Sequence, residues 1–346
     1  MSEALDRTKR SADASATRSP AFWVGATLLV LLALLALAAP LFGSPTRQDF
    51  TNGLTADGFP LGPGSRYLLG TDTLGRDMLA RLAYGGRVSL LVAIVSTATS
   101  LTIGTLVGLW AGYFRGPVEG VLMRITDVAL ALPAVLAALV LAALIPPGVG
   151  RVIVIITALF WAYPARLIYG EVVRLRGRGF VEAAEAFGSP GVSTVRRHIL
   201  PHTIPLVISY APLSAAGAVL FEATLSYLGA GINPPTPSWG NMISDGQGAI
   251  GFAPHILIEP SVILAGAILS FLLLGEGLKG GTATAVSRTS WLGVLRRAWV
   301  CWPSRSSASP RSRSSFSSSC QGIPLARSSR GSRVPRRSKR SASTCT

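Results

Sequence analysis

Residues 180 to 205, FVEAAEAFGSPGVSTVRRHILPHTIP, form a polar and sharply punctuated stretch between two long apolar runs. Its first part, VEAAEAF, is rich in strong helix formers and predicts a helix. Gly188 is typical of a helix end, Ser189 of an N-cap, and Pro190 of the first turn of a following helix. We expect that second helix to end at Pro201, since a proline disfavours the helical conformation of the residue before it. The stretch therefore predicts a helix, a sharp turn and a second helix, held between two apolar segments.

The composition of the chain excludes an ordinary soluble globular protein. Of its 346 residues, 49% are hydrophobic and only 14% are charged, and the mean hydropathy is +0.47. Six apolar runs are each close to or above the roughly 20 residues that a helix needs to cross a bilayer. They lie at residues 21–42, 88–113, 121–145, 152–172, 204–228 and 254–276. We therefore expect an all-α membrane protein with six spanning helices.

These runs divide the chain into a leader, a first span, a loop, a core and a tail. The parts are the leader 1–20, the first span 21–42, the loop 43–87, the five-span core 88–277 with its polar loop 173–203, and the tail 278–346. A signal peptide cleaved near Ala38 is the alternative for the first run. The run of roughly 22 residues is too long for a signal sequence, and five more runs follow it, so we interpret it as a span.

The distribution of Lys and Arg predicts which side of the membrane each loop faces. Four basic residues lie in the leader and five in the loop 173–203, whereas residues 229–253 contain none. The loop 43–87 has five arginines, but four aspartates balance them. Because basic loops stay on the cytoplasmic side, we expect both termini and the loop 173–203 to be cytoplasmic. The loops 43–87 and 229–253 are then extracytoplasmic, and their turn residues predict either a small ordered cap or solvated connections.

The tail from residue 278 carries most of the net charge of +16. It contains fourteen Lys and Arg and no Asp or Glu, which leaves +2 for the rest of the chain. All three cysteines, Cys301, Cys320 and Cys345, lie there without metal-ligand or disulfide spacing. We expect no packed fold in this tail. Two explanations stay open, an off-frame translation that begins near residue 279 and a polybasic segment attracted to anionic lipid or nucleic acid.

The sequence contains none of the motifs expected of an enzyme. The phosphate-loop pattern G-x-x-x-x-G-K-[ST] is absent, as are H-E-x-x-H and G-x-S-x-G. The three histidines, His198, His202 and His255, lack a matching set of triad or metal partners, and Pro201 argues against a shared helical face for the first two. We expect no catalytic residue, no metal site and no cofactor bound by this chain.

Ionisable residues inside the expected spans are the usual functional markers of membrane proteins, because a charge in hydrocarbon costs about 3 kcal/mol or more. Arg166, Glu222 and Glu259 meet this description, and Asp127 lies near a boundary. Glu222 is the residue we expect to face a polar cavity on the translocation path or a partner helix. The alternatives are a hydrogen bond between helices and a group that reaches the membrane interface.

The opening stretch resembles the EAA loop of ABC-importer permeases, whose pattern is E-A-A-x3-G-x9-I-x-L-P. The matching residues are Glu182, Ala183, Ala184, Gly188, Leu200 and Pro201. His198 departs from the apolar residue of many families, but R-H-x-L-P is the form found in peptide-type permeases. The resemblance therefore narrows the assignment to that branch.

Two further segments are similar to the dipeptide, oligopeptide and nickel permeases. Residues 69–93, LGTDTLGRDMLARLAYGGRVSLLVA, match the signature before the second span, and residues 225–243, LSYLGAGINPPTPSWGNMI, match the segment after the fifth. The signature residues before the second span are Gly70, Thr71, Asp72, Gly75, Arg76 and Asp77. Three motifs in the correct order, between about residues 20 and 277, make the resemblance specific.

The resemblance implies a six-helix type I importer permease with small extracytoplasmic loops, located in the bacterial inner membrane. It implies a homologous second permease subunit, two cytosolic ATPases that bind ATP and Mg, an extracytoplasmic solute-binding protein and membrane lipid as partners, and no nucleic acid. The EAA loop would act as a coupling helix on the ATPases, and the substrate class would be di- or oligopeptides. A secondary transporter or channel without ATPases is the alternative, although such carriers have no need of an EAA loop.

Overall fold

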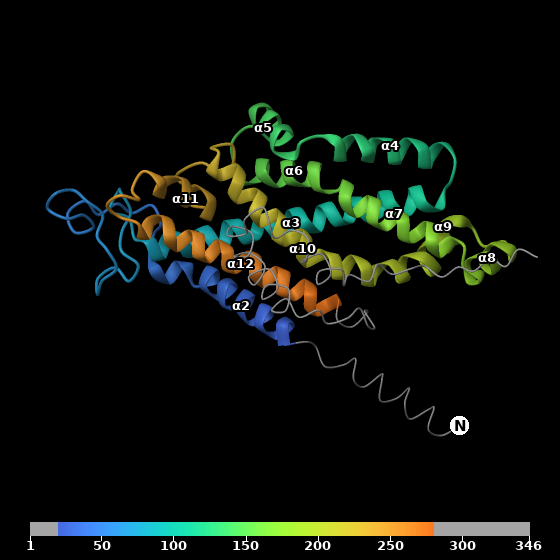
Figure 1. Cartoon of the computed structure of the whole chain (residues 1–346), viewed down its shortest axis with the longest axis horizontal. Coiled ribbons are helices and arrows are strands. Elements are labelled where there is room, and N and C mark those ends of the chain that lie inside the picture. Colours follow the sequence, from blue (N-terminus) through green and yellow to red (C-terminus); the bar gives the residue numbers. More distant parts are fainter. Residues whose placement is uncertain (1–19, 280–346) are drawn as a thin grey trace, which may run out of the picture. The chain divides into compact units, whose positions relative to one another are not determined.

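The computed structural model of the chain describes residues 20–279, and these residues form a helical bundle (Figure 1). Apart from helices, this range contains two isolated bridges, Leu54 with Pro60 and Thr71 with Asp77. Residues 1–19 of the expected leader and the tail from residue 280 lie outside the described range. The helices are α2 Pro20–Leu37, η1 Ala39–Phe42, α3 Met78–Tyr113, α4 Pro117–Ala131, α5 Ala134–Leu144, α6 Val149–Phe160, α7 Ala162–Arg176, α8 Gly179–Ala186, α9 Gly191–Thr194, η2 Val195–Ile199, α10 Leu200–Tyr227, α11 Trp239–Gln247 and α12 His255–Lys279.

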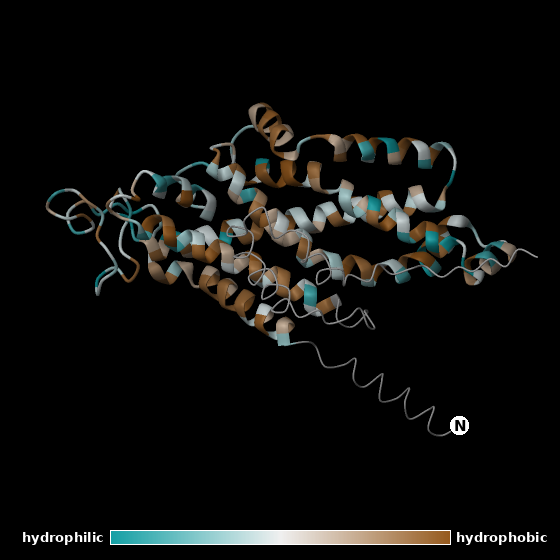
Figure 2. Ribbon diagram, in the orientation of Figure 1, coloured by the Kyte–Doolittle hydropathy of each residue, from teal (hydrophilic) through white to brown (hydrophobic). Residues whose placement is uncertain are grey.

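Five helical segments of the described range are long and apolar enough to cross a membrane. They are Pro20–Leu37, Met78–Tyr113, Val149–Arg176, Gly191–Tyr227 and His255–Leu278. A sixth crossing results if α4 and α5, which are bent by 94° relative to each other, form one broken span. Hydrophobic residues line the long helices, whereas the loop between α2 and α3 is largely hydrophilic (Figure 2). The prediction of an all-α membrane protein is confirmed.

Helix α3 begins at Met78, well before the expected start of the second span at residue 88. The extra turns contain two arginines, which made this segment look like loop, but the fold gives both of them partners. Arg81 pairs with Asp72, and the Arg87 guanidinium donates to the backbone carbonyls of Ala36 and Leu37 at 2.5 and 2.8 Å. The loop expected at residues 43–87 therefore ends before α3, and its last ten positions belong to the helix.

The third expected span, residues 121–145, is not one straight helix. Leu132 and Pro133 have extended backbone angles, and the chain turns there between α4 and α5. Proline removes one helical hydrogen bond and its ring clashes with the preceding turn, which accounts for the break. Hydropathy alone does not detect it, because the residues on both sides are apolar.

The expected helix end at Pro201 and the expected cap at Ser189 are both wrong. The N-cap of α9 is Pro190, with no side-chain cap bond, and the chain stays helical through Pro201 into α10. The π-helical turn η2 makes this possible, since the Leu200 amide donates to the carbonyl of Val195. The wider turn relieves the clash that a proline ring causes in a regular α-helix.

The segment expected as turns between the last two spans contains a buried helix. Helix α11 begins with a capping box, in which Ser238 and Asn241 bond each other's backbone amides. It packs against α10 and α12, and its Trp239 and Met242 are almost fully buried. The sequence left open whether this segment forms a small ordered cap or solvated connections, and the structure shows the ordered form.

Close packing of α3 against α7 depends on three glycines spaced one turn apart on α3. A Cβ added to Gly104, Gly108 or Gly112 would lie 2.6 to 2.7 Å from atoms of α7 or of the residue before it. For Gly108 the nearest atom is the carbonyl oxygen of Ala165, at 2.7 Å. In lipid, where helices gain no hydrophobic energy by associating, such small residues allow the backbone contact that holds them together.

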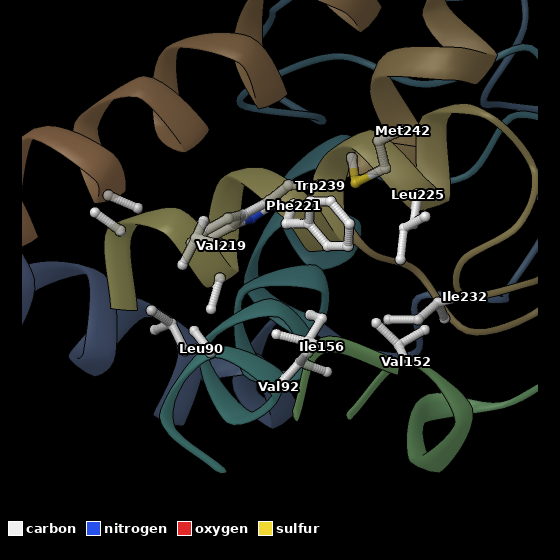
Figure 3. Close-up of a cluster of buried hydrophobic side chains, with 14 of the residues drawn as sticks. Leu90, Val92, Val152, Ile156, Val219, Phe221, Leu225, Ile232, Trp239 and Met242 are labelled. Atoms are coloured by element: carbon white, nitrogen blue, oxygen red, sulfur yellow. The ribbon is translucent and has the colours of Figure 1, made fainter. Parts of the chain in front are cut away.

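Two hydrophobic clusters lie along α3. The larger one joins α3, α6, α10 and α11 through residues such as Val92, Ile156, Leu225 and Trp239 (Figure 3). The smaller one joins the last turns of α3 to α7, α8 and η2. Its members are Leu109, Tyr113, Ile168, Val172, Leu175, Val181 and Ile199, and we call it the α8 cluster.

We expect Gly108→Ala to lower the thermal unfolding midpoint of the purified protein in detergent, because the new methyl group overlaps α7. Overpacking of this kind costs typically about 1–3 kcal/mol. Gly120→Ala is the matched control, since Gly120 also lies within a helix but has no heavy atom within 4 Å of its added Cβ. Equal midpoints for the two variants would contradict the close α3–α7 packing.

Candidate functional sites

The first candidate site is the loop that contains α8, at the end of the bundle opposite the loop between α2 and α3 (Figure 1). Val181 is fully buried and fixes α8 to the α8 cluster. The Arg176 guanidinium, just before α8, donates to the carbonyl of Tyr113 at 2.7 Å and lies over the Tyr113 ring at 5.5 Å. One face of the short helix is therefore anchored by apolar contacts, and the end of α7 that leads into it is held to α3 by Arg176.

The end of α8 is closed by a Schellman motif centred on Gly188. The Ser189 amide donates to the Ala184 carbonyl at 3.0 Å, and the Gly188 amide donates to the Glu185 carbonyl at 2.9 Å. Gly188 has φ +76°, a left-handed conformation that side chains with a Cβ adopt at a cost. Its predicted role as a helix stop is confirmed, and the chain direction after α8 is fixed.

The structure brings the predicted EAA-loop residues to one end of the bundle but gives them different surroundings. Glu182 and Ala183 are exposed on α8, whereas Ala184 is half-buried. His198 lies in η2, where its carbonyl lies 2.7 Å from the Nδ1 atom of His202. The His202 ring in turn stacks on Phe180 of α8, with ring centroids 5.1 Å apart. This stack, which links the loop to α10, was missed from the sequence because it depends on the unbroken helix through Pro201.

The second candidate site is the signature segment before α3, which folds around the buried carboxylate of Asp72. One oxygen of Asp72 accepts the amides of Leu74 and Arg76 at 2.9 Å each, and the other bonds the Arg76 Nε at 2.6 Å and the Arg81 guanidinium. Arg81 also reaches Asp245 of α11 at 3.2 Å. Asp72 and Arg81 are 1% and 4% exposed, so the pair is effectively out of water.

The remaining signature residues hold the same segment in place. Thr71 donates its hydroxyl to the Gly53 carbonyl at 2.5 Å, and its own carbonyl lies 3.1 Å from the Nε2 atom of His255 in α12. Asp77 caps α3 by accepting the Leu79 amide. Burial raises the pKa of Asp77, although the amide hydrogen bonds to its carboxylate oppose this shift. Gly70 and Gly75 occupy left-handed positions with φ +74° and +68°.

These contacts indicate a structural role for the signature, because they tie the loop before α3 to α11 and α12. Asp245 and His255 were not recognised as partners of this segment. They lie more than 160 positions away in sequence, and no local pattern marks them.

Glu222 is fully buried, and hydrogen bonds occupy its carboxylate. It accepts the hydroxyls of Ser89 on α3 and Ser226 on α10, both at 2.8 Å. The Ser89 oxygen also accepts the Trp239 amide at 3.4 Å, so the carboxylate is linked to the first turn of α11. This arrangement corresponds to the alternative of a hydrogen bond between helices and differs from an open polar path. A carboxylate near a helix N-terminus is also favoured by the helix dipole.

Arg151 is a buried cation that the sequence did not mark as a candidate. Its guanidinium donates to the carbonyls of Ala142 at 3.2 Å and Gly231 at 2.5 Å. Ala142 lies in the last turn of α5, and Gly231 follows the end of α10. The cation therefore stabilises the negative end of α5 and joins it to the loop after α10.

A cavity of about 500 Å³ opens between α7 and α10 beside the α8 loop. Its polar lining comes from Glu171, Arg174, His202, Ser209 and Tyr210. Glu171 and Arg174 bond each other, and Glu222 does not belong to this lining. Of the other ionisable residues within spans, Arg166 pairs with Asp127 at 3.1 Å and joins α7 to α4.

Comparison with known proteins identifies the family. Residues 104–280 match the family described as "Binding-protein-dependent transport system inner membrane component". The chain is 35% identical over 231 residues to the glutathione transport system permease protein GsiD of Pectobacterium atrosepticum, with 67% of this chain and 77% of that protein covered. It is 34% identical over 252 residues to the oligopeptide transport system permease protein OppC of Haemophilus influenzae, with coverages of 73% and 80%.

A probable peptide ABC transporter permease protein of Sinorhizobium fredii is 38% identical over 265 residues, with 76% of this chain and 89% of that protein covered. The fold is similar to that of a chain in the inward-facing MetNI methionine ABC transporter. The TM-score is 0.51 at 21% identity, with 60% of this chain and 98% of that chain covered, and the likeness concerns the fold alone.

The chain therefore belongs to the family of binding-protein-dependent transport system inner membrane components. It is a multi-pass permease subunit of an ABC importer, a class that works with ATPase and binding-protein partners. The resemblance drawn from the three sequence motifs is confirmed.

We expect Arg81→Gln to destabilise the purified protein, because it removes one of the two guanidinium groups that pair with the buried Asp72 and also the partner of Asp245. Breaking one side of a buried ion pair costs about 3–5 kcal/mol, and the remaining pair with Arg76 keeps the expected loss at the lower end of this range. Arg66→Gln is the control, since Arg66 is 63% exposed and lies 3.9 Å from Asp49; exposed pairs contribute about 0–1 kcal/mol. Thermal unfolding in detergent measures the stability of both variants. An equally small loss of stability in the two would count against the buried network.

We expect Gly188→Ala to loosen the end of α8, because a Cβ disfavours the left-handed conformation by about 1–2 kcal/mol. Hydrogen exchange at the amides of Gly188 and Ser189 should then become about five- to tenfold faster. Gly188→Asn should show a smaller change, since asparagine tolerates this conformation better than alanine does. Unchanged exchange in the alanine variant would argue against the Schellman closure.

Proposed function

We propose that this permease subunit forms half of the translocation pathway of an importer for di- and oligopeptides. In this proposal it couples to two cytosolic ATPases through the α8 loop. The observation that carries the coupling role is the construction of this loop. One face is fixed to the α8 cluster, the end is closed at Gly188, and the opposite face exposes Glu182 and Ala183.

The mechanism of coupling is a mechanical bias and involves no chemistry within this chain. ATP binding and hydrolysis take place in the partner ATPases, which bind ATP and Mg. Their closure displaces α8, and the displacement shifts the permease between two conformations. A rigid loop serves this purpose, because a flexible one would absorb the movement. The chain itself acts as a non-catalytic membrane subunit.

The proposed substrate class rests on the names of the relatives and on the loop motif. The relatives transport glutathione in one case and oligopeptides in another, as their names state. The sequence R-H-I-L-P at residues 197–201 is the form that resembles peptide-type permeases. Choice among dipeptides, oligopeptides and glutathione belongs to the solute-binding protein in this proposal.

The full assembly contains a homologous second permease, two ATPases and an extracytoplasmic binding protein, within membrane lipid and without nucleic acid. We place it in the bacterial inner membrane, with both termini and the α8 loop in the cytoplasm. The arginines of the α8 loop support this orientation, since basic loops are retained on that side. The signature segment before α3 then faces the binding protein.

We expect Glu182→Gln and Gly188→Ala each to separate ATP hydrolysis from peptide uptake while membrane insertion stays normal. The measurement is uptake per ATP hydrolysed, in proteoliposomes that contain the complete complex and the binding protein. Asp57→Asn is the control, because it removes an exposed carboxyl from the loop before α3.

An unchanged ratio in both α8-loop variants would contradict the coupling role. Peptide uptake that continues without ATPases would instead favour a secondary transporter.

A further inference from the structure

Phe187 is 92% exposed, the highest value among the large exposed hydrophobic side chains of the described residues. It lies outside the segments that can span a membrane, which end at Arg176 and resume at Gly191. Leu136 and Val140 are also strongly exposed, but they lie in α5, which faces lipid in a membrane protein. Leu41 and Leu68 lie outside the spans as Phe187 does, but in the segment between α2 and α3, at the other end of the bundle. Lipid contact of the spans therefore gives no reason for the exposure of Phe187.

The backbone of Phe187 is held on both sides. Its own amide donates to the Ala183 carbonyl at 3.0 Å, and the next two amides close the Schellman motif. Gly188 then turns the chain away from the helix end. Because the backbone is already ordered, binding has to order only the two side-chain torsions of the phenylalanine, a low entropic cost for an interface anchor.

The side chains of α8 next to the Phe187 ring leave room for a partner surface. Ala183 lies one turn before Phe187 and therefore on the same side of α8. Helical side chains lean toward the N-terminus, so the ring lies on the same side as this small and exposed residue, and its 92% exposure shows that it does not pack against α8. Glu182 is exposed on a neighbouring side of α8, whereas Glu185 lies one turn after the buried Val181 and hydrogen-bonds with Tyr113 of α3. A complementary surface would have an apolar pocket with a basic residue at its edge.

We propose that Phe187 is the apolar anchor of the α8 loop, and that its ring enters an apolar pocket on the ATPase subunit, with a basic residue at the edge of the pocket opposite Glu182. This inference rests on the proposed coupling function, and it names the residue on which the affinity of the permease for the ATPase subunit depends. Glu182 selects the partner by charge, and Phe187 supplies the area buried at the centre of the contact.

The test compares single variants of the full chain in the purified permease pair. Affinity for the ATPase subunits is measured in lipid nanodiscs. Phe187→Ala should weaken binding about ten- to hundredfold, the effect of burying one large apolar side chain. Phe187→Leu should stay within about threefold of the wild type, because it keeps most of the apolar surface. Val192→Ala, which removes another exposed apolar side chain of the same loop, should bind normally.

A photoreactive benzoylphenylalanine at position 186, next to the ring, separates failure of this inference from failure of the proposed function. Capture of an ATPase subunit together with normal binding by Phe187→Ala would overturn the anchor and leave the coupling role intact. Absence of capture with normal binding by all variants would overturn both. Capture of lipid would overturn the anchor as well, since it would place the ring on the membrane surface.

Discussion

The contact between α3 and α7 is the constraint on which the rest of the structure depends. Helix α3 has 36 residues and is roughly 54 Å long at 1.5 Å per residue, well beyond a hydrocarbon core of about 30 Å. Its first turns carry the ion pairs of the signature segment, and its last turns carry the α8 cluster. The glycines at 104, 108 and 112 bring α7 against its backbone. Because α7 continues into the α8 loop, this contact determines where the loop lies.

The two ends of α3 are stabilised by different forces. Before α3, buried charges dominate, since Asp72, Arg81 and Asp245 form one network. Such ion pairs depend on geometry and lose their stabilising effect when one partner is displaced. At the α8 end, apolar contacts around Val181 dominate. Hydrophobic burial is non-directional, so it can persist through a small rigid-body shift. Apolar contacts therefore suit the α8 loop, which moves with a partner in the proposed coupling. Buried ion pairs suit the segment before α3, which stays in place.

Much of the fold was predictable from the sequence, because long apolar runs have few alternatives in a bilayer. The run that became α2 and the end of α3 at Tyr113 lie close to their predicted positions. The start of α3 was not predictable from hydropathy, since Arg81 and Arg87 look like loop residues until their distant partners are known.

Among the site residues, Gly188 was predictable because a left-handed helix end strongly favours glycine. The environment of Glu222 was not predictable, since it depends on Ser89 of another helix. The exposure of Phe187 was equally hidden. A phenylalanine in a membrane protein is expected to face lipid or the core, and only the geometry of the helix end directs it elsewhere.

The π-helical turn explains how a movement of the α8 loop can reach the far half of the protein. Because η2 carries the helix past Pro201, α9, η2 and α10 form one continuous segment from Gly191 to Tyr227. Its first part contains the prolines at 201, 205 and 212 and has few buried side chains, whereas most side chains from Ser214 to Ser226 are buried. Missing backbone hydrogen bonds and sparse packing make the first part easier to bend. The buried part holds Glu222 and, through Ser89, the beginning of α11. In the proposed coupling, bending would therefore concentrate in the first part of this segment, and the buried part near α11 would move as a unit.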